Sequence, residues 1–168
     1  ILMENLKLCS TNQLESDAAG QILEILENLL RGDIDSKRIS AAANTAKLVD
    51  SHENIVVLFD ILETAEVSTA CSAVEILRIL HRNSAPSLEA TVLECPAGMQ
   101  RLLDILASFD DDERDPLRNL TIELWEQLTG TNNDMQLFLA LQEGFEHLSG
   151  IMQSERDSGP ITRDCLAI

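Results

Sequence analysis

Apolar residues recur every three to four positions through most of the chain, which is the spacing of one face of an α-helix. In residues 97–130 this pattern predicts two helices joined by a short acidic turn. The first stripe consists of Met99, Leu102, Leu103 and Leu106. The second stripe consists of Leu117, Leu120, Leu124 and Leu128. Asp115 followed by Pro116 predicts the start of the second helix, because an oxygen-bearing cap precedes a proline that needs no N–H partner.

Similar helices are predicted on both sides of this pair. They cover residues 21–31, 36–49, 54–64, 67–81, 145–152 and 160–168. Two shorter helices, at 88–93 and 135–141, each precede a sharp corner. Near the start of the chain, Ser10 and Gln13 predict a capping box for a short helix that Gly20 ends.

Three of these predictions name buried or exposed positions. In residues 21–31 the expected apolar stripe is Ile22, Ile25, Leu26, Leu29 and Leu30. In residues 36–49, which Asp35 is expected to cap, the buried positions are expected to be Ile39, Ala42, Ala43, Ala46 and Val49. At the end of the chain, where no capping helix follows, we expect an exposed apolar face at Ile161, Cys165 and Leu166.

Segments of the chain repeat at a nearly constant distance. Residues 59–62 (FDIL) recur as 103–106 (LDIL), a shift of 44, and Gly98 recurs as Gly144, a shift of 46. Periods in the forties built from two or three helices are typical of armadillo and HEAT arrays. The alternative is an ordinary helical bundle whose helices resemble one another.

The predicted architecture is therefore all-α. We expect a single right-handed α-solenoid of armadillo/HEAT-like repeats over residues 1–168, with about four repeats, the last one truncated. The approximate repeats are 1–50, 51–82, 83–130 and 131–168. Because the chain starts without Met and stops inside a helical pattern, we expect it to be a fragment of a longer protein.

The amino-acid composition favours a helical fold and limits the kinds of partner that the chain can bind. Hydrophobic residues make up 45% of the 168 residues and aromatic residues only 3%, a balance that favours helices over sheets. Twelve Lys and Arg oppose 29 Asp and Glu, for a formal net charge of −17. Such a surface repels phosphate backbones and anionic lipids, so we expect no nucleic-acid binding and only indirect membrane contact. A basic patch on another protein is the natural complement.

No motif in the sequence points to catalysis. The GxSxG, HExxH, Walker and GxGxxG patterns are absent, so we expect neither an enzyme nor a cofactor. The histidines, His52, His81 and His147, fall in different repeats, and His81 is expected near a helix C-terminus, where a cationic ring suits the dipole. The cysteines have neither zinc nor disulfide-framework spacing, which fits a reducing, cytosolic setting and predicts no metal. They are Cys9, Cys71, Cys95 and Cys165.

The acidic run Asp110–Glu113 admits two interpretations. It could bind calcium, but it lacks the alternate spacing, the central Gly and the distal Glu of an EF-hand loop. A solvated turn whose last acid, Asp115, caps a helix is the favoured interpretation.

Armadillo arrays usually bind partners along the concave face, which the last helix of each repeat lines. Polar residues between the apolar positions of these helices could hydrogen-bond an extended peptide or a small GTPase, although a solvated helix face is the alternative for each residue. Lys37 and Ser40 lie on the first such helix. The candidate partner-binding residues are Asn44, Glu75, Arg78, Arg82, Asn119, Glu123, Glu126 and Arg163. Trp125, beside this set, is expected in the core rather than as an exposed anchor.

Residues 95–107 (CPAGMQRLLDILA) resemble the armadillo-repeat head of the general vesicular transport factor family, which are long Golgi tethers with a coiled-coil tail. The resemblance continues through 123–129 (ELWEQLT), 143–152 and 164–166, and upstream at 52–58 (HENIVVL). It covers about residues 51–168. The family's coiled-coil tail and acidic terminus have no counterpart here, and the run Asp110–Glu113 lengthens one loop beyond the family pattern.

The resemblance implies a protein–protein interaction module of a vesicle-tethering factor. Such a factor would act in endoplasmic reticulum-to-Golgi and intra-Golgi transport, in the cytoplasm and peripheral to Golgi membranes. Its implied partners are a Rab-type small GTPase and SNARE or other tethering proteins, and the full-length protein is implied to be a homodimer. The alternative is an armadillo or HEAT adaptor of an unrelated complex. An enzyme whose site assembles from distant residues is a third class.

Overall fold

The computed structural model of the chain describes residues 1–11, 16–32, 35–107, 115–130, 132–154 and 160–168. These residues contain no strand, so the expected all-α class is confirmed for them. Their helices are α1 (Leu2–Thr11), α2 (Ser16–Leu30), α3 (Asp35–Val49), α4 (His52–Thr64), α5 (Val67–Leu93), α6 (Pro96–Ala107), α7 (Asp115–Thr129), α8 (Asn133–Leu141), α9 (Gly144–Ser154) and α10 (Pro160–Ala167).

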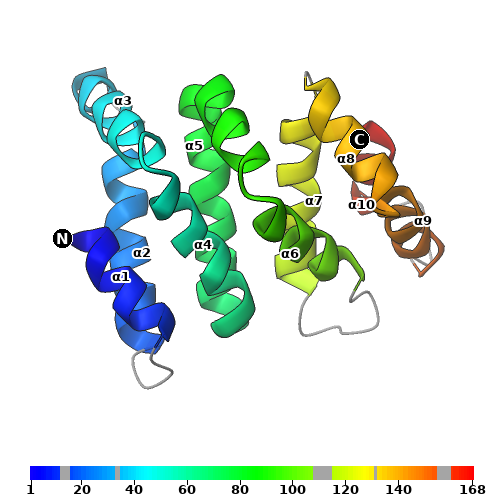
Figure 1. Cartoon of the computed structure of the whole chain (residues 1–168), viewed down its shortest axis with the longest axis horizontal. Coiled ribbons are helices and arrows are strands. Elements are labelled where there is room, and N and C mark those ends of the chain that lie inside the picture. The colour runs from blue at the N-terminus through cyan, green and yellow to red at the C-terminus, as the bar shows by residue number, and fades with distance from the viewer. Residues whose placement is uncertain (12–15, 33–34, 108–114, 131, 155–159) are drawn as a thin grey trace.

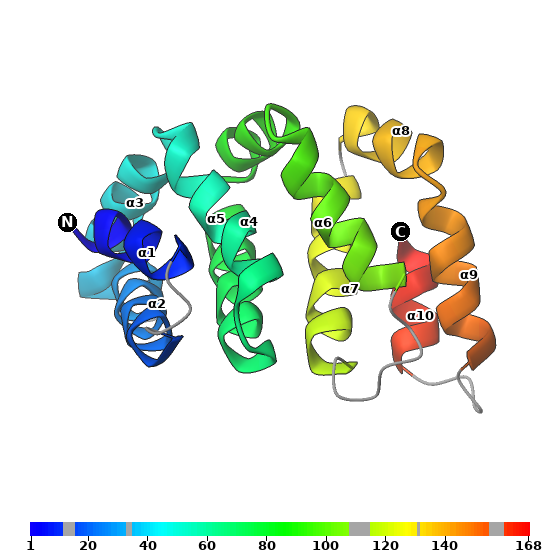
Figure 2. The ribbon, with the colours of Figure 1, turned by 60° about the horizontal axis from the view of Figure 1, so that its bottom comes forward.

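The helices stack side by side in two long rows (Figures 1 and 2). Helices α1, α4, α6 and α9 form one row, and α2, α5, α7 and α10 form the other, with each helix contacting the next one in its row. Helix α3, the end of α5 and helix α8 lie along one edge of the stack, the upper edge in Figure 1. Stacking in one direction, with the two termini at opposite ends, is consistent with an α-solenoid.

One continuous apolar core runs between the two rows. The stripes predicted in residues 97–130 contribute to it, since Met99, Leu102, Leu103 and Leu106 are all buried. Trp125 is fully buried, which confirms its expected place in the core, and its ring stacks on Phe138 of α8 with centroids 6.3 Å apart. The acidic run at 110–113 lies outside the described residues.

The predicted breaks between helices are largely confirmed. The gap between the helices predicted at 67–81 and 88–93 is a kink inside α5, where Ser84 has non-helical φ and ψ of −158° and 70°. Asn132 caps α8, because its side-chain oxygen accepts hydrogen bonds from the backbone N–H groups of Asp134 and Met135. Glu143 has a φ of 60° where the chain turns from α8 into α9. The expected corners therefore exist, although the short helix at 88–93 is continuous with α5.

The predicted stripe of α3 is wrong at four of its five positions, and only Val49 is buried as expected. Ile39 is 83% exposed, and Ala42, Ala43 and Ala46 are exposed as well. The buried face is instead Ala41, Thr45, Leu48 and Val49. Both sets have helical spacing, and because α3 is rich in alanine, burial of either face removes little apolar area. Hydrophobic periodicity therefore could not choose between them.

Three predictions near the chain ends are also corrected. Gly20 lies inside α2 instead of ending a short helix, and Ser10 lies within α1 instead of starting one. In α2, Ile25 and Leu29 are about half exposed. At the other end, Leu166 is exposed as expected, but Cys165 is buried because α10 packs on both α7 and α9.

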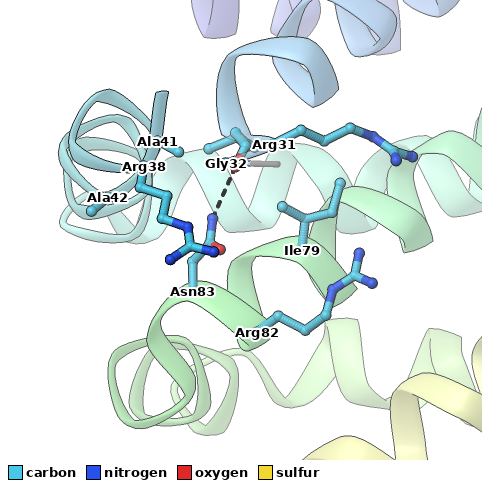
Figure 3. A pocket seen from close by; sticks show the side chains of 9 residues that line it. Arg31, Gly32, Arg38, Ala41, Ala42, Ile79, Arg82 and Asn83 are labelled. Atoms are coloured by element: carbon cyan, nitrogen blue, oxygen red, sulfur yellow. Dashed lines mark hydrogen bonds between the residues drawn. The ribbon is translucent and has the colours of Figure 1, made fainter. Parts of the chain in front are cut away.

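Polar side chains join neighbouring parts of the stack. Asn83 of α5 donates hydrogen bonds from Nδ2 to the Leu30 carbonyl (3.0 Å; Figure 3) and to Thr45 Oγ1 (2.9 Å). Farther along, Glu89 accepts a bond from Asn132 Nδ2 at 2.8 Å. Asn83 directly precedes the kink in α5 and Asn132 follows α7, so each fixes its part of the α2–α5–α7–α10 row to a preceding part of the stack.

His81 belongs to the second of these joints. Its Nε2 lies 2.9 Å from Glu89 Oε1, across the kink in α5. The ring therefore has a specific carboxylate partner, whereas the sequence indicated only a favourable position in the helix dipole.

None of the described helices combines the length with the apolar character that crossing a bilayer requires.

Two glycines let helices approach closely at corresponding places, the starts of α6 and α9. A Cβ atom at Gly98 would overlap the ring of Phe59 in α4. A Cβ atom at Gly144 would lie 2.8 Å from the Leu139 carbonyl oxygen. In contrast, a Cβ atom at Gly20 would have Thr69 Oγ1 as its nearest neighbour, at 3.8 Å. The repeated glycine at a shift of 46 thus marks a steric requirement.

Replacing Leu103 with alanine is expected to lower the free energy of unfolding by about 2 to 5 kcal/mol, because the fully buried side chain leaves a cavity. Leu106→Ala should lower the free energy of unfolding by a similar amount. Ile39→Ala, at an exposed position, is the control and should stay within about 0.5 kcal/mol of the unsubstituted chain. Urea unfolding measures all three. Unchanged stability of both leucine variants would contradict the described core.

Alanine substitutions at two glycines are expected to have opposite signs. Gly98→Ala should destabilise the fold by about 1 to 3 kcal/mol, because the new methyl group forces α6 away from Phe59. Gly20→Ala should stabilise it by about 0.4 to 1 kcal/mol, because the helix has space and the unfolded chain loses freedom. Thermal unfolding of both variants tests this, and a shift of the same sign in both would be inconsistent with the packing of α6 on α4.

Candidate protein-binding face

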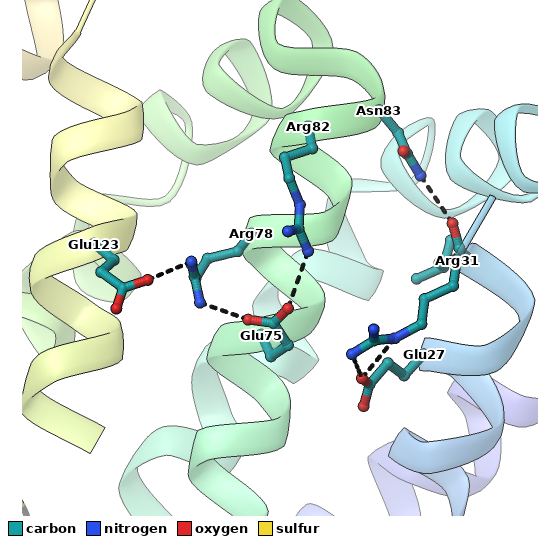
Figure 4. Close-up of polar contacts among 8 residues, drawn as sticks. Glu27, Arg31, Glu75, Arg78, Arg82, Asn83 and Glu123 are labelled. Atoms are coloured by element: carbon teal, nitrogen blue, oxygen red, sulfur yellow. Dashed lines mark hydrogen bonds and ion pairs between the residues drawn. The ribbon is translucent and has the colours of Figure 1, made fainter. Parts of the chain in front are cut away.

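Four of the predicted partner-binding residues form one ion-pair network on α5 and α7 (Figure 4). Arg78 Nη1 lies 2.7 Å from Glu75 Oε2, and Arg78 Nη2 pairs with Glu123 of α7. Arg82 Nη2 lies 3.0 Å from the other oxygen of Glu75. The network therefore runs along α5 for two turns and crosses to the next helix of its row.

Burial divides these four side chains into two kinds. The side chains of Arg78 and Glu75 are only 14% and 21% exposed, so their charges are largely committed to each other. Those of Arg82 and Glu123 are 53% and 38% exposed. The inner pair can thus hold the outer two in place, while Arg82 and Glu123 present charge to solvent.

The network has a counterpart on α2 that the sequence reasoning missed. Glu27 accepts a hydrogen bond of 2.9 Å from Nε of Arg31, one helical turn later (Figure 4). Positions 27, 75 and 123 are all glutamates and lie 48 residues apart, each on a helix of the α2–α5–α7–α10 row. The 48-residue spacing of these glutamates, together with the Glu27-to-Arg31 pair at i and i+4, could have indicated this counterpart from the sequence.

The other predicted residues are not all part of this face. Asn44 lies on α3, outside the row, and its side chain donates a 2.9 Å hydrogen bond to the Leu29 carbonyl. Its assignment to a last helix is corrected, because α2 and not α3 is the row's neighbour of α5. Asn119 of α7 is half-buried, and its Oδ1 has no hydrogen-bond partner among the residues that the structure describes. Glu126 of α7 is half-buried and Arg163 of α10 is exposed.

One cysteine and one histidine come together elsewhere, at the corner before α6. Cys95 Sγ lies 3.4 Å from His52 Nδ1, and Glu94 Oε2 lies 3.9 Å from the same nitrogen. Burial, with a smaller contribution from the charge of Glu94, raises the pKa of the Cys95 thiol. A nucleophilic cysteine needs a lowered pKa and access to solvent, so this pair lacks the features of a catalytic dyad.

The described part of the chain contains no group of three or more histidine, cysteine or acidic side chains placed to hold a metal ion. Its charged clusters include pairs of opposite sign on both rows, since Arg101 of α6 also pairs with Asp60 of α4 at 2.6 Å. Such an arrangement can recognise another protein surface through hydrogen bonds and charge.

Comparison with known proteins finds several that are similar to this chain. It is 29% identical to general vesicular transport factor p115 of Bos taurus and 28% identical to that of Homo sapiens, over 178 aligned residues in each case. The alignments cover 99% of this chain. The predicted resemblance to the general vesicular transport factor family is confirmed. Golgin candidate 6 of Arabidopsis thaliana is 29% identical over 129 residues, or 76% of this chain.

The similarity to general vesicular transport factors extends farther than the sequence reasoning placed it, since it includes residues 1–50. The chain spans 18% of the length of each p115 protein and 14% of golgin candidate 6. No protein-family model matches the chain.

The cysteine environment makes a prediction about thiol chemistry. Cys95 is buried and the pKa of its thiol is raised, so it should react with iodoacetamide at neutral pH more slowly than the half-buried Cys9. Peptide mass spectrometry after timed labelling measures both sites, and labelling in urea, where the two rates should converge, is the control. Faster labelling of Cys95 in the folded chain would indicate an activated thiolate and revive an enzymatic role.

Proposed function

We propose that this chain is a protein-binding segment of a vesicle-tethering factor that acts in endoplasmic reticulum-to-Golgi and intra-Golgi transport. The similarity to general vesicular transport factors along 99% of the chain carries the proposal, and the similarity to a golgin supports the Golgi as the place of action. The factor would work in the cytoplasm, peripheral to Golgi membranes, with membrane contact through partners and as a homodimer in its full-length form.

The proposed architecture is a right-handed α-solenoid of about four armadillo-like repeats. The support comes from corresponding positions: Gly98 and Gly144 lie in the first turns of α6 and α9, and Pro116 and Pro160 lie in the first turns of α7 and α10. The α2–α5–α7–α10 row then corresponds to the last helices of successive repeats, which usually line the binding face.

We propose that partners bind along this row through the outer charges of the network. Arg82, Glu123, Glu126 and Arg163 would make the contacts, while Glu75 and Arg78 hold the first two of these in position. Charges arranged along a helix row suit a GTP-loaded Rab-type small GTPase, and SNARE proteins are the second class of proposed partner.

Capture of purified GTP-loaded small GTPases by the immobilised chain tests the proposal. A secretory-pathway member should bind, and Glu126→Lys should reduce its capture about 10-fold, because a like charge then faces the partner's basic surface. Glu146→Lys is the matched control, since this exposed glutamate lies on α9 in the other row.

Two outcomes would count against the proposal. If no secretory-pathway GTPase binds the unsubstituted chain, this result supports the alternative that the chain is an adaptor of an unrelated complex. If a GTPase binds but Glu146→Lys reduces capture as much as Glu126→Lys does, the binding face is not the α2–α5–α7–α10 row.

A further inference from the structure

Helix α8 is apolar on all sides, although one of its sides faces solvent. All of residues 135–141 except Gln136 are apolar. Met135 and Leu139 are buried against the stack. On the opposite side of the helix, Leu137 is 57% exposed and Leu141 is 70% exposed. A helix that is apolar all round is typical of an element covered on more than one face, so a partner for the exposed side is expected.

The exposed side of α8 is an apolar stripe with a charge at one end. Leu137, Ala140 and Leu141 lie at i, i+3 and i+4 and are all exposed. Asp134, three residues before Leu137, lies one turn earlier on the same side of the helix. We call these four residues the outer face of α8.

The corresponding segment one repeat earlier, the end of α5, lacks these leucines. Two buried positions of α8 have buried counterparts 47 residues earlier. They are Met135 with Leu88 and Leu139 with Val92. The same shift places Ala90 and Glu94 at the positions of the two exposed leucines, and both are exposed, although α3 and α8 lie on either side of this segment along the edge of the stack (Figure 1). A neighbouring repeat therefore leaves this side of the edge open, and the fold does not require leucine there.

Acidic residues flank the outer face of α8. Residues 119–155 contain no Lys or Arg. Asp134 at one end of the stripe and Glu143 beyond the other end are exposed, and neither has an ion-pair partner among the residues that the structure describes. An apolar stripe between two unpaired carboxylates attracts a basic surface and repels anionic lipids. A second copy of this chain, with the same acids and a net charge of −17, is repelled as well.

The backbone of α8 limits the form of the partner. Its N–H and C=O groups are used within the helix, so α8 offers no strand edge, and recognition depends on side chains. An amphipathic helix meets this requirement, because its own stripe at i, i+3 and i+4 can interdigitate with that of α8. The nine residues of α8 span about 13 Å, which about three turns of a partner helix would cover.

We propose that the outer face of α8 binds an amphipathic helix of a partner protein, in which basic residues flank the apolar stripe at both ends. Leu137 and Leu141 pack against that stripe, and Asp134 and Glu143 pair with the basic residues. This site goes beyond the proposed function, because α8 belongs to neither of the two rows and none of the four residues takes part in the charge network on α5 and α7.

The test uses the 168-residue chain and a fluorescently labelled peptide of about 18 residues, long enough to form a helix in water. Its leucines lie at i, i+3, i+4 and i+7 in an alanine background, with lysines beyond each end of this stripe. Fluorescence anisotropy should show saturable binding that weakens as salt is raised. A peptide with glutamine in place of leucine measures the attraction due to charge alone and should bind about 10-fold more weakly or less.

Substitution of either exposed leucine should weaken the binding. Leu137→Gln and Leu141→Gln should each raise the dissociation constant about 10-fold, because each removes an apolar side chain from the contact. Ile39→Gln is the matched control, since Ile39 is 83% exposed on α3, at the same edge of the stack. All three positions are exposed, so thermal unfolding should show nearly the same stability in each variant.

The two acids should have a smaller effect on affinity. The double variant Asp134→Asn, Glu143→Gln should bind the peptide about 3-fold more weakly and with less dependence on salt, because exposed ion pairs contribute little. The double variant Glu53→Gln, Glu94→Gln is the control. It removes two exposed acids elsewhere in the stack and changes the net charge equally, so it should leave the affinity nearly unchanged.

Backbone amide resonances of the isotope-labelled, unsubstituted chain locate the peptide without any substitution, and those of α8 should shift while those of α3 should not. Several results would overturn the proposal: no saturable binding, equal binding of the glutamine peptide, unchanged affinity in both leucine variants, or shifts confined to other helices. Self-association that Leu141→Gln abolishes would assign this face to a second copy instead. A failure of GTPase capture leaves peptide binding unaffected, so the two proposals fail separately.

Discussion

Burial of apolar helix faces against neighbouring helices is the interaction on which this structure depends. A single helix of this kind cannot remove its stripe from water, so the stack exists only as a set of contacts between successive helices. Helix α5 is central to that set, because it contacts α2, α3, α4, α6 and α7. The close approach of α6 to Phe59, which Gly98 permits, shows how tightly the spacing within a row is set. Every polar feature of the surface is positioned by this packing.

Polar side chains then fix the angles that apolar packing leaves adjustable. Hydrophobic contact is non-directional, whereas a hydrogen bond requires a particular distance and orientation. Asn83 and Asn132 supply such bonds at two successive joints, the first to Leu30 and Thr45 and the second to Glu89. Asn83 directly precedes the kink at Ser84, so its bonds fix the part of α5 before the kink to α2 and α3.

The fold could be predicted from the sequence wherever apolar and polar residues differ strongly. The leucines of α6 and α7 define one face without ambiguity, and Asp115, Pro116 and Asn132 mark helix starts by their chemistry. The prediction failed at every position of α3 but Val49, because the alanines make opposite faces almost equally apolar and burial was decided by contacts with α2, α4 and α5. It failed again at Gly20, because the packing of α2 on α5 outweighs the small helical cost of one glycine.

The candidate binding face was predictable only in part, for a related reason. Charged residues on α5 and α7 could be found by asking which positions lie between the apolar ones, but their pairing could not. Arg78 meets Glu123 across 45 positions of sequence, and that contact exists because two helices of one row lie side by side. Once the row is known, the glutamates at 27, 75 and 123 become a repeated feature, with an arginine four or three residues after the first two. The third, Glu123, has no arginine three or four residues after it and pairs with Arg78 of the preceding helix, so the pairing extends along α5 and on to α7. Charges of both signs therefore follow one another along the row, from Glu27 and Arg31 through the Glu75 pairs to Glu123. A partner that follows the row would meet both signs along its length.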